Sequence, residues 1–546
     1  MMKANKQIGF ININEESIDK IIQNGDVVFE RGFLREKTST TLPINFGGVG
    51  KDLKDYKVYG NTVQNGTPTP DTPIDMVSCG DRTKNLFDKN NANVYGGYLN
   101  TSGVVSGSGN SGTDTIIFIK CKPNTTYALQ KMLQPDTENN RLRIGCTSEI
   151  PVLGMQTTNF FKYNDGTTET QYVYKTSSTA KYLLFYCGKK SDTTSRQEIL
   201  DSVQIEEGST ISSYEPYGYK IPINVKGNNL FKPIPTTSCG ITSIVNPDGS
   251  ITYSGTATNT WANITSHNYI DIEPGTYTFS IDKTLSYRLS IRLYYEDGSY
   301  DVKMILPGQK STTFTLNKEA KHYYIYISNS LTVEEEYNET IYVQLEKGNT
   351  MTSFKPYYNQ TTNIYLDEPL RKIDEYSDNI DFINGKVVRN IREIVLGSES
   401  SISALNNNES GAAQSSSNGA FMIYFSTNGI KNLKNSSVIL NQFLYMYNSS
   451  IIDNISANRM QDKTACIRQG SNDRIYFRNT DWTGKTGNEV RDLFGITNLI
   501  LNYILTTPTE ESITLPNIPT VEGNNTLNIE TEITPSQVYI KYKSNN

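Results

Sequence analysis

Hydrophobic and polar residues alternate along much of this chain with a period of two. In an extended chain this alternation places successive side chains on opposite faces, so that one face can be buried while the other is solvated. The pattern therefore predicts half-buried β-strands. The clearest examples are the runs 277–281, 289–295, 323–327 and 341–345.

Turn signals separate these runs. Asp-Gly pairs occur at 165–166, 248–249 and 297–298, and this dipeptide favours a type I′ hairpin because both residues tolerate positive φ. Many short strands joined by such turns, with no sustained helical periodicity, are typical of antiparallel sheets packed face to face. We therefore expect an all-β chain of tandem antiparallel β-sandwich domains with a jelly-roll-like topology.

Two long stretches of the chain repeat each other. Asn85–Lys89 returns as Asn229–Pro233, and Val203–Thr210 returns as Val343–Thr350. The offsets, 229 − 85 = 144 and 343 − 203 = 140, differ slightly, as they do when loops vary in length between corresponding strands. Each unit is far longer than the roughly 20 to 50 residues of a solenoid repeat. The repetition therefore predicts two sandwich domains, each with its own core.

The first 50 residues predict a small attachment segment. Glu15–Asn24 has isoleucines at helical spacing and predicts a short amphipathic helix, and the strand-like run Asp26–Phe33 follows. The predicted helix and strand together are shorter than the roughly 40 residues that usually hold a core without disulfides, metals or partner chains. We therefore expect this segment to dock on another protein. The later stretch Asn61–Pro73 is punctuated by proline and predicts an extended connector.

Beyond Leu370 the repeated pattern stops. Gly397–Asn418 is rich in Ser and Asn and predicts a long mobile loop. Asn488–Phe494 predicts one short helix, and Tyr503–Leu505 a strand. We therefore expect five consecutive units: an N-terminal helix-strand attachment segment (1–50), a Pro-rich connector (51–84), two β-sandwich repeats (85–225 and 226–366) and a mostly-β C-terminal domain (367–546).

Net charge and hydropathy limit the classes of partner. The formal net charge is −6 and the pI about 5.4, so no general positive field attracts a phosphate backbone, and we expect no nucleic acid partner. No run approaches the roughly 18 apolar residues of a membrane span, and Met1–Lys6 does not lead into the apolar stretch of a secretory signal. We expect a soluble protein, made in the cytoplasm without a signal peptide and not inserted in a membrane.

Cysteine and histidine give little support for metal or redox chemistry. Six cysteines occur without a C-x-x-C pair, and Cys121 and Cys187 lie in strand-like runs, where a free cysteine usually acts as a small buried hydrophobic residue. A disulfide framework is not expected in a chain made in the cytoplasm. The two histidines, His267 and His322, are expected on strand surfaces. We therefore expect no metal and no cofactor.

No motif assigns a reaction. Gly107–Gly112 fits G-x-G-x-x-G, but polar loop sequence flanks it where a nucleotide site requires a strand and a helix. Gly484–Thr486 lacks the rest of a P-loop. The acidic clusters Glu334–Glu336 and Glu296–Asp297 lie at predicted turns, where solvated charge is the usual role. We expect that the chain is not an enzyme, and no residue is assigned a catalytic role.

The two tryptophans are the candidate binding residues. Trp261 and Trp482 lie in polar stretches rich in Asn, Asp and Thr. An aromatic face beside amide and hydroxyl groups suits a sugar ring, which stacks through its C–H groups and hydrogen-bonds through its hydroxyls. The alternative is that each indole closes one end of a sandwich, because Trp is highly buried on average. The 36 tyrosines suit either a recognition surface or ordinary strands.

Several sequence segments resemble those of a known class of proteins. They are Gly60–Pro70, Lys84–Asp88, Thr507–Glu510, Leu515–Thr520 and the final stretch from Ile529 to Tyr542. From about residue 55 onward the chain resembles tail-fibre and receptor-binding baseplate proteins of phages, prophages and phage-tail-like particles of low-GC Gram-positive bacteria. The resemblance implies carbohydrate-binding-like sandwiches at a virion tail tip, an N-terminal piece attached to other tail or baseplate proteins, and a homotrimer. It carries over no catalytic motif.

Three functions remain open from the sequence. The first is adhesion to a host cell-wall glycan through the sandwiches. The second is a purely structural baseplate or fibre subunit, because glycan-binding folds are also used as spacers. The third is a polysaccharide-degrading tail spike. Because an acidic chain repels a polyanion, we expect a neutral or zwitterionic glycan, or a locally basic pocket that net charge does not reveal.

Overall fold

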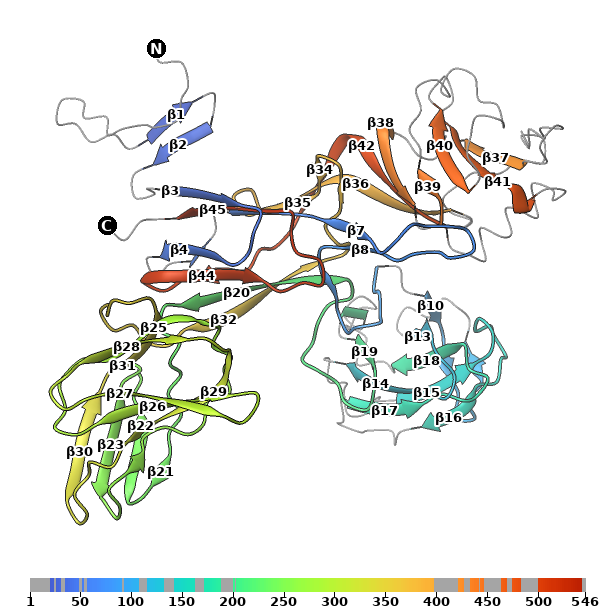
Figure 1. Ribbon diagram of the computed structural model, residues 1–546. Coiled ribbons are helices and arrows are strands. Elements are labelled where there is room, and N and C mark those ends of the chain that lie inside the picture. The colour runs from blue at the N-terminus through green and yellow to red at the C-terminus, as the bar shows by residue number, and fades with distance from the viewer. Residues whose placement is uncertain are drawn as a thin grey trace.

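The computed structural model is built almost entirely of β-strands (Figure 1). The all-β, antiparallel sandwich prediction is confirmed, with a single parallel pair, β39–β40, among the described strands. No helix in the described part of the chain is long and apolar enough to cross a membrane. The structure describes residues 20–23, 26–30, 35–48, 52–53, 56–90, 93–107, 115–131, 142–162, 171–187, 200–201, 203–396, 421–426, 433–440, 442–445, 463–468, 474–482 and 499–542.

The predicted N-terminal helix is wrong where it can be compared. Lys20–Gln23 is strand β1, and it pairs antiparallel with β2 (Asp26–Glu30). Gln23 lies opposite Asp26, so the sequence Asn24-Gly25 falls between the paired strands. Asn-Gly is a strong hairpin signal, and the isoleucines at 21 and 22 favour a strand because they branch at Cβ. Residues 15–19 and 24 lie outside the described residues.

The first repeat forms two main sheets. One sheet has the order β10-β13-β18-β15-β16 and the other has the order β17-β14-β19, and a small hairpin, β11–β12, lies beside them. The two sheets share one core, which includes Phe87, Ile117, Leu129 and Phe185. The strands are β10 (Asn93–Gly96), β11 (Tyr98–Leu99), β12 (Val105–Ser106), β13 (Thr115–Lys120), β14 (Thr126–Lys131), β15 (Leu142–Thr147), β16 (Thr158–Lys162), β17 (Gln171–Lys175), β18 (Tyr182–Cys187) and β19 (Val203–Glu207).

The second repeat has the same plan. Its sheet β24-β29-β26-β27 corresponds to β13-β18-β15-β16, and its sheet β28-β25-β31 corresponds to β17-β14-β19. A further sheet, β21-β22-β23-β30, has no counterpart of the same order among the described strands of the first repeat. The strands are β21 (Thr237–Ser238), β22 (Ile241–Val245), β23 (Ile251–Thr256), β24 (Ala262–Asn263), β25 (Gly275–Ile281), β26 (Leu289–Tyr295), β27 (Tyr300–Ile305), β28 (Ser311–Leu316), β29 (Ala320–Ile327), β30 (Glu336–Ile341) and β31 (Val343–Lys347).

The alternating runs behave as predicted. Tyr277, Phe279 and Ile281 are buried in the core of the second repeat, and so are the apolar members of the runs in β26, β29 and β31, apart from half-buried Tyr295. The two Asp-Gly pairs that the structure describes lie in hairpin turns, but only the glycines have positive φ, 83° at Gly249 and 78° at Gly298. They are therefore not type I′ turns. At 246–249 the cause is Pro247, whose ring holds φ negative at the first central position.

The sequence segments that occur in both repeats join the two ends of each sandwich. Asn229 is buried, and its amide group donates to the carbonyl oxygens of Val343 and Lys355 at 3.1 and 2.8 Å. Its side-chain oxygen accepts from the backbone N–H groups of Phe231 and Leu345 at 2.9 and 3.1 Å. Three of these four hydrogen bonds join the start of the repeat to its end, and the fourth fixes the backbone at Phe231. We call this arrangement the asparagine clasp.

The first repeat has the same clasp. Asn85 forms the corresponding four bonds, with Val203, Glu215, Phe87 and Ile205. The repeated phrases are therefore structural, because they satisfy buried backbone groups where the chain enters and leaves each sandwich. They mark the two ends of each domain.

A third sandwich, which we call the central sandwich, lies between the two repeats and a separate sheet formed within residues 421–479 (Figure 1). Its sheets have the orders β32-β20-β44-β4, with β9 also on β20, and β3-β45-β6-β35-β36-β42-β38. One core joins them, with Phe46, Val58, Ile223, Ile364 and Ile540 among its members. The strands are β3 (Arg35–Ser39), β4 (Ile44–Gly48), β6 (Tyr56–Tyr59), β9 (Asp81–Arg82), β20 (Tyr219–Gly227), β32 (Asn359–Leu366), β35 (Asn379–Asp381), β36 (Lys386–Leu396), β38 (Leu433–Leu440), β42 (Leu499–Ser512), β44 (Gly523–Ile529) and β45 (Gln537–Tyr542).

This pairing corrects the expected division into five consecutive units. The central sandwich takes strands from all five, because β4 and β6 pair with C-terminal strands and β20 pairs with both β32 and β44. The two repeats are insertions in it: the first lies between β9 and β20, and the second between β20 and β32. The boundaries at 225 and 366 therefore fall at strands of the central sandwich.

The proline-punctuated connector is also partly folded. β7 (Thr62–Gln64) and β8 (Met76–Ser78) pair as a hairpin whose loop holds the prolines. Two further small pairs are β5 (Asp52–Leu53) with β43 (Ile518–Pro519), and β33 (Lys372–Ile373) with β34 (Tyr376–Ser377). The loop turns back on itself, with the N–H of Thr72 donating to the carbonyl oxygen of Thr69 at 3.2 Å. The segment is therefore a hairpin and not the extended connector that the sequence predicts.

The remaining C-terminal strands form a four-stranded sheet, β37-β41-β40-β39. Its members are β37 (Phe421–Ser426), β39 (Leu444–Tyr445), β40 (Thr464–Arg468) and β41 (Arg474–Asn479), and the 3₁₀ turn η2 (Thr480–Trp482) follows. The predicted strand at Tyr503–Leu505 is part of β42. The predicted loop 397–418 and helix 488–494 lie outside the described residues.

Candidate functional site

One face of the second repeat is built from outward-pointing aromatic residues. In β26, Leu289, Ile291 and Leu293 are buried in the core, so the alternate residues, Arg292 and Tyr294 among them, point to the other side. The same alternation in β29 buries Tyr323, Ile325 and Ile327. We call the opposite side the aromatic face; its members are Arg292, Tyr294, Tyr300, His322, Tyr324 and Tyr326, with His267 and Tyr269 from the loop after β24.

The rings of the aromatic face touch one another in a continuous layer. Tyr294 stacks on His322 with ring centroids 4.4 Å apart and an interplanar angle of 11°. His267 lies 4.6 Å from the ring of Tyr324 and 5.3 Å from that of His322. Tyr300 extends the layer, 5.5 Å from Tyr294. Rings in mutual contact lose little conformational freedom when a ligand binds, so the layer is preorganised.

A single arginine lies within this layer. The guanidinium carbon of Arg292 is 4.7 Å from the ring centroid of Tyr300 and 5.1 Å from that of Tyr326. Cation–π attraction at these distances holds the side chain against the rings. The Nη2 group of Arg292 forms a long hydrogen bond, 3.5 Å, with the hydroxyl oxygen of Tyr326. The described residues give Arg292 no ion-pair partner.

The loop that carries His267 and Tyr269 is held by Asn268. This buried amide donates to the carbonyl oxygen of Lys232 at 2.8 Å and to the hydroxyl of Tyr323 at 3.0 Å. Its backbone also bridges to Tyr323. Because Asn268 is fixed on both sides, its two aromatic neighbours are set beside His322 and Tyr324.

Burial changes the titration of the face. It lowers the pKa of His322 below 6.5, and the neighbouring His267 lowers it further. His322 is therefore neutral at pH 7. Burial, together with a hydrogen bond to Tyr294, raises the pKa of Tyr324 to about 12, so this phenol stays protonated. The permanent charge on the face is that of Arg292.

The outer rings are accessible to a ligand. Tyr269 is 78% exposed and Tyr300 is 53% exposed, whereas Tyr324 and Tyr326 are buried beneath them at the middle of the sheet. A surface with flat rings, phenol hydroxyls and imidazole nitrogens offers both stacking and hydrogen bonding. That is the combination a pyranose requires, since it has apolar C–H faces and polar edges.

The corresponding face of the first repeat is covered. Ile116, Leu184 and Tyr186 on β13 and β18 form a second small core with Leu99 and Val105 from β11 and β12. Met155 and Phe160 pack against the same cluster. The two repeats therefore share a fold, but the aromatic face is open only in the second.

Trp261 lies at one end of the aromatic face. It directly precedes β24, where Ala262 is fully buried, so alternation places Trp261 on the outer side with Asn263. Asn263 lies opposite Tyr326 in the sheet, and Trp261 is 38% exposed. No ring contact joins it to the tyrosines among the described interactions.

Trp482 belongs to another part of the molecule. It ends η2, after β41 of the C-terminal sheet, whereas Trp261 belongs to the second repeat. The structure does not bring the two tryptophans into one site. The side chain of Trp482 lies outside the described part of the structure, so its role in carbohydrate binding stays a prediction.

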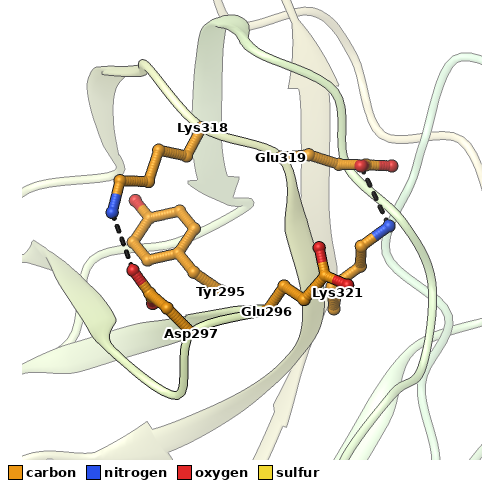
Figure 2. A pocket seen from close by; sticks show the side chains of 6 residues that line it. All are labelled: Tyr295, Glu296, Asp297, Lys318, Glu319 and Lys321. Carbon is orange, nitrogen blue, oxygen red and sulfur yellow. Dashed lines mark hydrogen bonds and ion pairs between the residues drawn. The ribbon is translucent and has the colours of Figure 1, made fainter.

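A charged hollow lies where β26 ends and β29 begins (Figure 2). Its volume is 420 Å³, and its lining residues are Tyr295, Glu296, Asp297, Lys318, Glu319 and Lys321. Four of its five charges form two ion pairs, Lys318 with Asp297 at 2.9 Å and Lys321 with Glu319 at 2.9 Å (Figure 2). The ammonium of Lys318 also lies 5.5 Å from the ring centroid of Tyr295. Because these groups already have partners, we place the candidate site on the aromatic face.

Metal and disulfide chemistry find no support in the residues that the structure covers. They contain no group of three or more His, Cys, Asp or Glu side chains arranged to hold an ion. Cys79, Cys121, Cys146 and Cys239 are free. Cys121 packs against the core of the first repeat but is only half-buried, so it is less buried than predicted. The side chain of Cys187 is outside the described set.

Comparison with known proteins adds no assignment. A scan against protein-family models and a search of curated proteins return no match. Among solved structures, an oxalate decarboxylase from Bacillus subtilis is 11% identical and aligns over 47% of this chain and 72% of its own, with a TM-score of 0.12. Infectious bursal disease virus, Gx strain, aligns over 60% of this chain and 76% of its own at 11% identity, with a TM-score of 0.11. Scores this low carry no argument about fold or function.

Sequence reasoning missed most of the aromatic face. The signal was present in β26 and β29, where Arg, Tyr and His occupy the outward positions apart from Ser290. Tyrosine is common in ordinary strands, and Tyr323 faces the core while Tyr324 faces outward. Because tyrosine occurs on both faces of β29, residue type alone does not distinguish a binding surface from the core.

Proposed function

We propose that this chain is a receptor-binding tail-fibre or baseplate subunit that adheres to a cell-surface glycan through the aromatic face of the second repeat. The observation that carries the proposal is the open layer of contacting rings on one sheet, with its corresponding sheet in the first repeat covered. The resemblance of the sequence to tail-fibre proteins supplies the particle and the host, low-GC Gram-positive bacteria. The first repeat then serves as a spacer.

The test is adhesion of the labelled full-length chain to intact cells of several low-GC Gram-positive strains. We expect strain-selective binding, and we expect Tyr300→Ala combined with Tyr269→Ala to weaken it about tenfold or more, the size of effect seen for exposed aromatic anchors. Both rings are exposed, so the fold tolerates the change. Tyr365→Ala, on β32 of the central sandwich, is the matched control and retains binding.

The outcomes separate the alternatives. Strain-independent absence of binding contradicts the receptor role and favours a purely structural baseplate or fibre subunit. Binding that survives the double tyrosine variant places the site elsewhere, with Trp482 as the next candidate. Release of new reducing sugar ends from cell walls would favour a polysaccharide-degrading spike.

A further inference from the structure

The arginines on the outer faces of the two repeats form an internal comparison. Arg143 on β15 lies directly across from Tyr186, and its guanidinium carbon is 5.8 Å from that ring. Arg292 on β26 lies directly across from Tyr324, at 5.5 Å. The two side chains therefore occupy corresponding places on corresponding sheets.

The two arginines differ in what accepts their hydrogen bonds. In the first repeat, the Nη1 group of Arg143 donates to the carbonyl oxygen of Leu99, which belongs to the covering hairpin β11–β12. In the second repeat no such hairpin lies over Arg292 among the described strands, and its Nη2 group meets the phenol oxygen of Tyr326 instead of a backbone carbonyl. The Nε atoms of both arginines are buried without a hydrogen-bond partner. A guanidinium carries five N–H donors, and among the described residues the acceptors of Arg292 are the neutral phenol oxygens of Tyr326 and Tyr294.

No carboxylate of the aromatic face neutralises Arg292. The outward positions of the four strands are Asn263; Ser290, Arg292 and Tyr294; Tyr300, Val302 and Met304; and His322, Tyr324 and Tyr326. None of them is acidic. The nearest acidic residue on β27, Asp301, lies opposite Leu293 on the other side of the sheet and pairs with Lys303 at 3.0 Å.

We propose that the aromatic face is specific for a glycan that carries an anionic substituent, and that Arg292 is the residue that selects it. A carboxylate or phosphodiester oxygen accepts from the Nη groups of Arg292, in the role that the carbonyl of Leu99 has toward Arg143. A neighbouring sugar ring stacks on Tyr300. This inference rests on the proposed function, and it reconciles an acidic chain with an anionic ligand because Arg292 places one positive charge on a face whose strands carry no outward carboxylate.

The geometry suits a planar or tetrahedral oxyanion better than a neutral hydroxyl. A guanidinium offers parallel N–H groups that match two oxygens of one acid group, and such charge-assisted bonds are roughly twice as strong as neutral ones. Because rings surround Arg292 on one side, the site excludes part of the water that would screen the interaction. A neutral sugar would still stack but would leave the charge without a partner.

The test uses cell walls purified from a strain that the full-length chain binds. One portion is left untreated, one is treated with hydrofluoric acid to remove phosphodiester-linked polymers, and one is amidated with ethanolamine through a carbodiimide to neutralise carboxylates. Wild type, Arg292→Gln and Arg292→Lys are compared on each. Lys347→Gln, which removes one exposed positive charge from β31 in the other sheet, is the matched control.

We expect Arg292→Gln to lower affinity for untreated walls about tenfold or more, Arg292→Lys to lower it less, and Lys347→Gln to leave it unchanged. The affinity of wild type falls by a similar factor when the treatment has removed the recognised group from the wall. On that treated wall, wild type binds no better than Arg292→Gln. Loss after hydrofluoric acid identifies a phosphodiester, and loss after amidation identifies a carboxylate. Melting temperature and amide exchange of β26 show whether each variant is folded.

Equal binding of wild type and folded Arg292→Gln to untreated walls overturns this inference and leaves the proposed function standing, with a neutral glycan as ligand. A wild-type chain that binds no wall overturns the proposed function, and this inference with it. If Arg292→Gln is unfolded, Arg292→Lys decides the question, because it keeps the positive charge but not the paired N–H groups. Unchanged binding of Arg292→Lys to untreated walls, together with wild-type binding that neither treatment reduces, also overturns the inference.

Discussion

At the scale of single residues, buried amides hold the molecule together. The clasp of Asn229 satisfies two carbonyls and two N–H groups in the second repeat. Asn268 likewise donates hydrogen bonds to a backbone carbonyl and to a tyrosine hydroxyl in the loop that carries His267 and Tyr269. A buried polar group without a partner costs about 1 to 3 kcal/mol. These two asparagines therefore contribute to stability through the backbone groups that they satisfy.

Removal of the clasp should destabilise one repeat selectively. We expect Asn229→Ala to lower the free energy of unfolding of the second repeat by roughly 3 kcal/mol, because it leaves several buried backbone groups without partners. Hydrogen exchange of the amides in β31 and β25 measures the change. Asn349→Ala, the same substitution at an exposed position, should have almost no effect. Equal exchange in both variants would show that the clasp is not stabilising.

The first repeat should depend on pH through Glu206. Burial raises the pKa of this carboxyl, but hydrogen bonds from Ser212 and Gln204 outweigh it, so that the pKa lies below 4.5. Since the folded pKa is lower than the unfolded one, the carboxylate stabilises the fold above about pH 4.3, and this contribution is lost as the pH falls through the folded value.

The measurement is the urea midpoint of the first repeat at pH 7 and at pH 3. We expect Glu206→Gln to lower the midpoint at pH 7 and to reduce the difference between the two pH values. Glu207→Gln, at the adjacent exposed position, is the control and should keep the wild-type difference. A wild-type pH difference that persists in Glu206→Gln would assign the dependence to other carboxylates.

At the scale of elements, strands were predictable and their partners were not. The buried alternation in β25, β26, β29 and β31 follows from local sequence, since period two is a property of the strand itself. The pairing of β4 with β44 joins residues more than 470 positions apart, and no local pattern encodes it. The same holds for the aromatic face, which needs three strands and a loop to be placed together before its residues become a surface.

The hairpin that covers the first repeat depends on a glycine with no room for a side chain. Gly103 has φ of 81°, and an added Cβ would lie 2.6 Å from the ring of Phe160. Gly154 has a similar φ of 84° with nothing within 4 Å. Both alanine variants should lose about 1 kcal/mol or more from the unfavourable φ, and Gly103→Ala should lose roughly 1 to 3 kcal/mol more from overpacking.

Amide exchange in β11 and β12 distinguishes these two effects. We expect faster exchange there in Gly103→Ala than in Gly154→Ala, while β14 and β19 of the other sheet keep the wild-type rate. If the two variants behave alike, the contact of Gly103 with Phe160 is not what holds the cover in place.

At the scale of the whole molecule, the central sandwich links the two ends of the chain. Both repeats leave and re-enter it at neighbouring positions: β9 pairs with β20, and the N–H of Gly227 donates to the carbonyl oxygen of Tyr358 at 2.9 Å. Each repeat has a core of its own. Insertions with adjacent ends are tolerated by a host fold because they do not interrupt its strand pairing.

A truncation after Asp367 should therefore unfold the central sandwich and spare the repeats. It removes β36, β42, β44 and β45, so β4 loses its partner and β20 keeps only β32 and β9 along its edges. In such a chain we expect the amides of β4, β6 and β20 to exchange at rates near those of unfolded peptide, because the core that they share with the C-terminal strands is gone.

The same truncated chain should keep the aromatic face, since β26, β27 and β29 belong to the inserted second repeat. Protected amides in these strands, together with retained adhesion, would show that the receptor site depends on the insertion and not on the C-terminal strands. Excision of residues 229–357, with a short Gly-Ser link from Asn228 to Tyr358, is the reciprocal variant: it should keep β4 and β20 protected and lose adhesion. Loss of protection in β26 on truncation would mean that the second repeat needs the central sandwich in order to fold, and the two units would then be one cooperative structure.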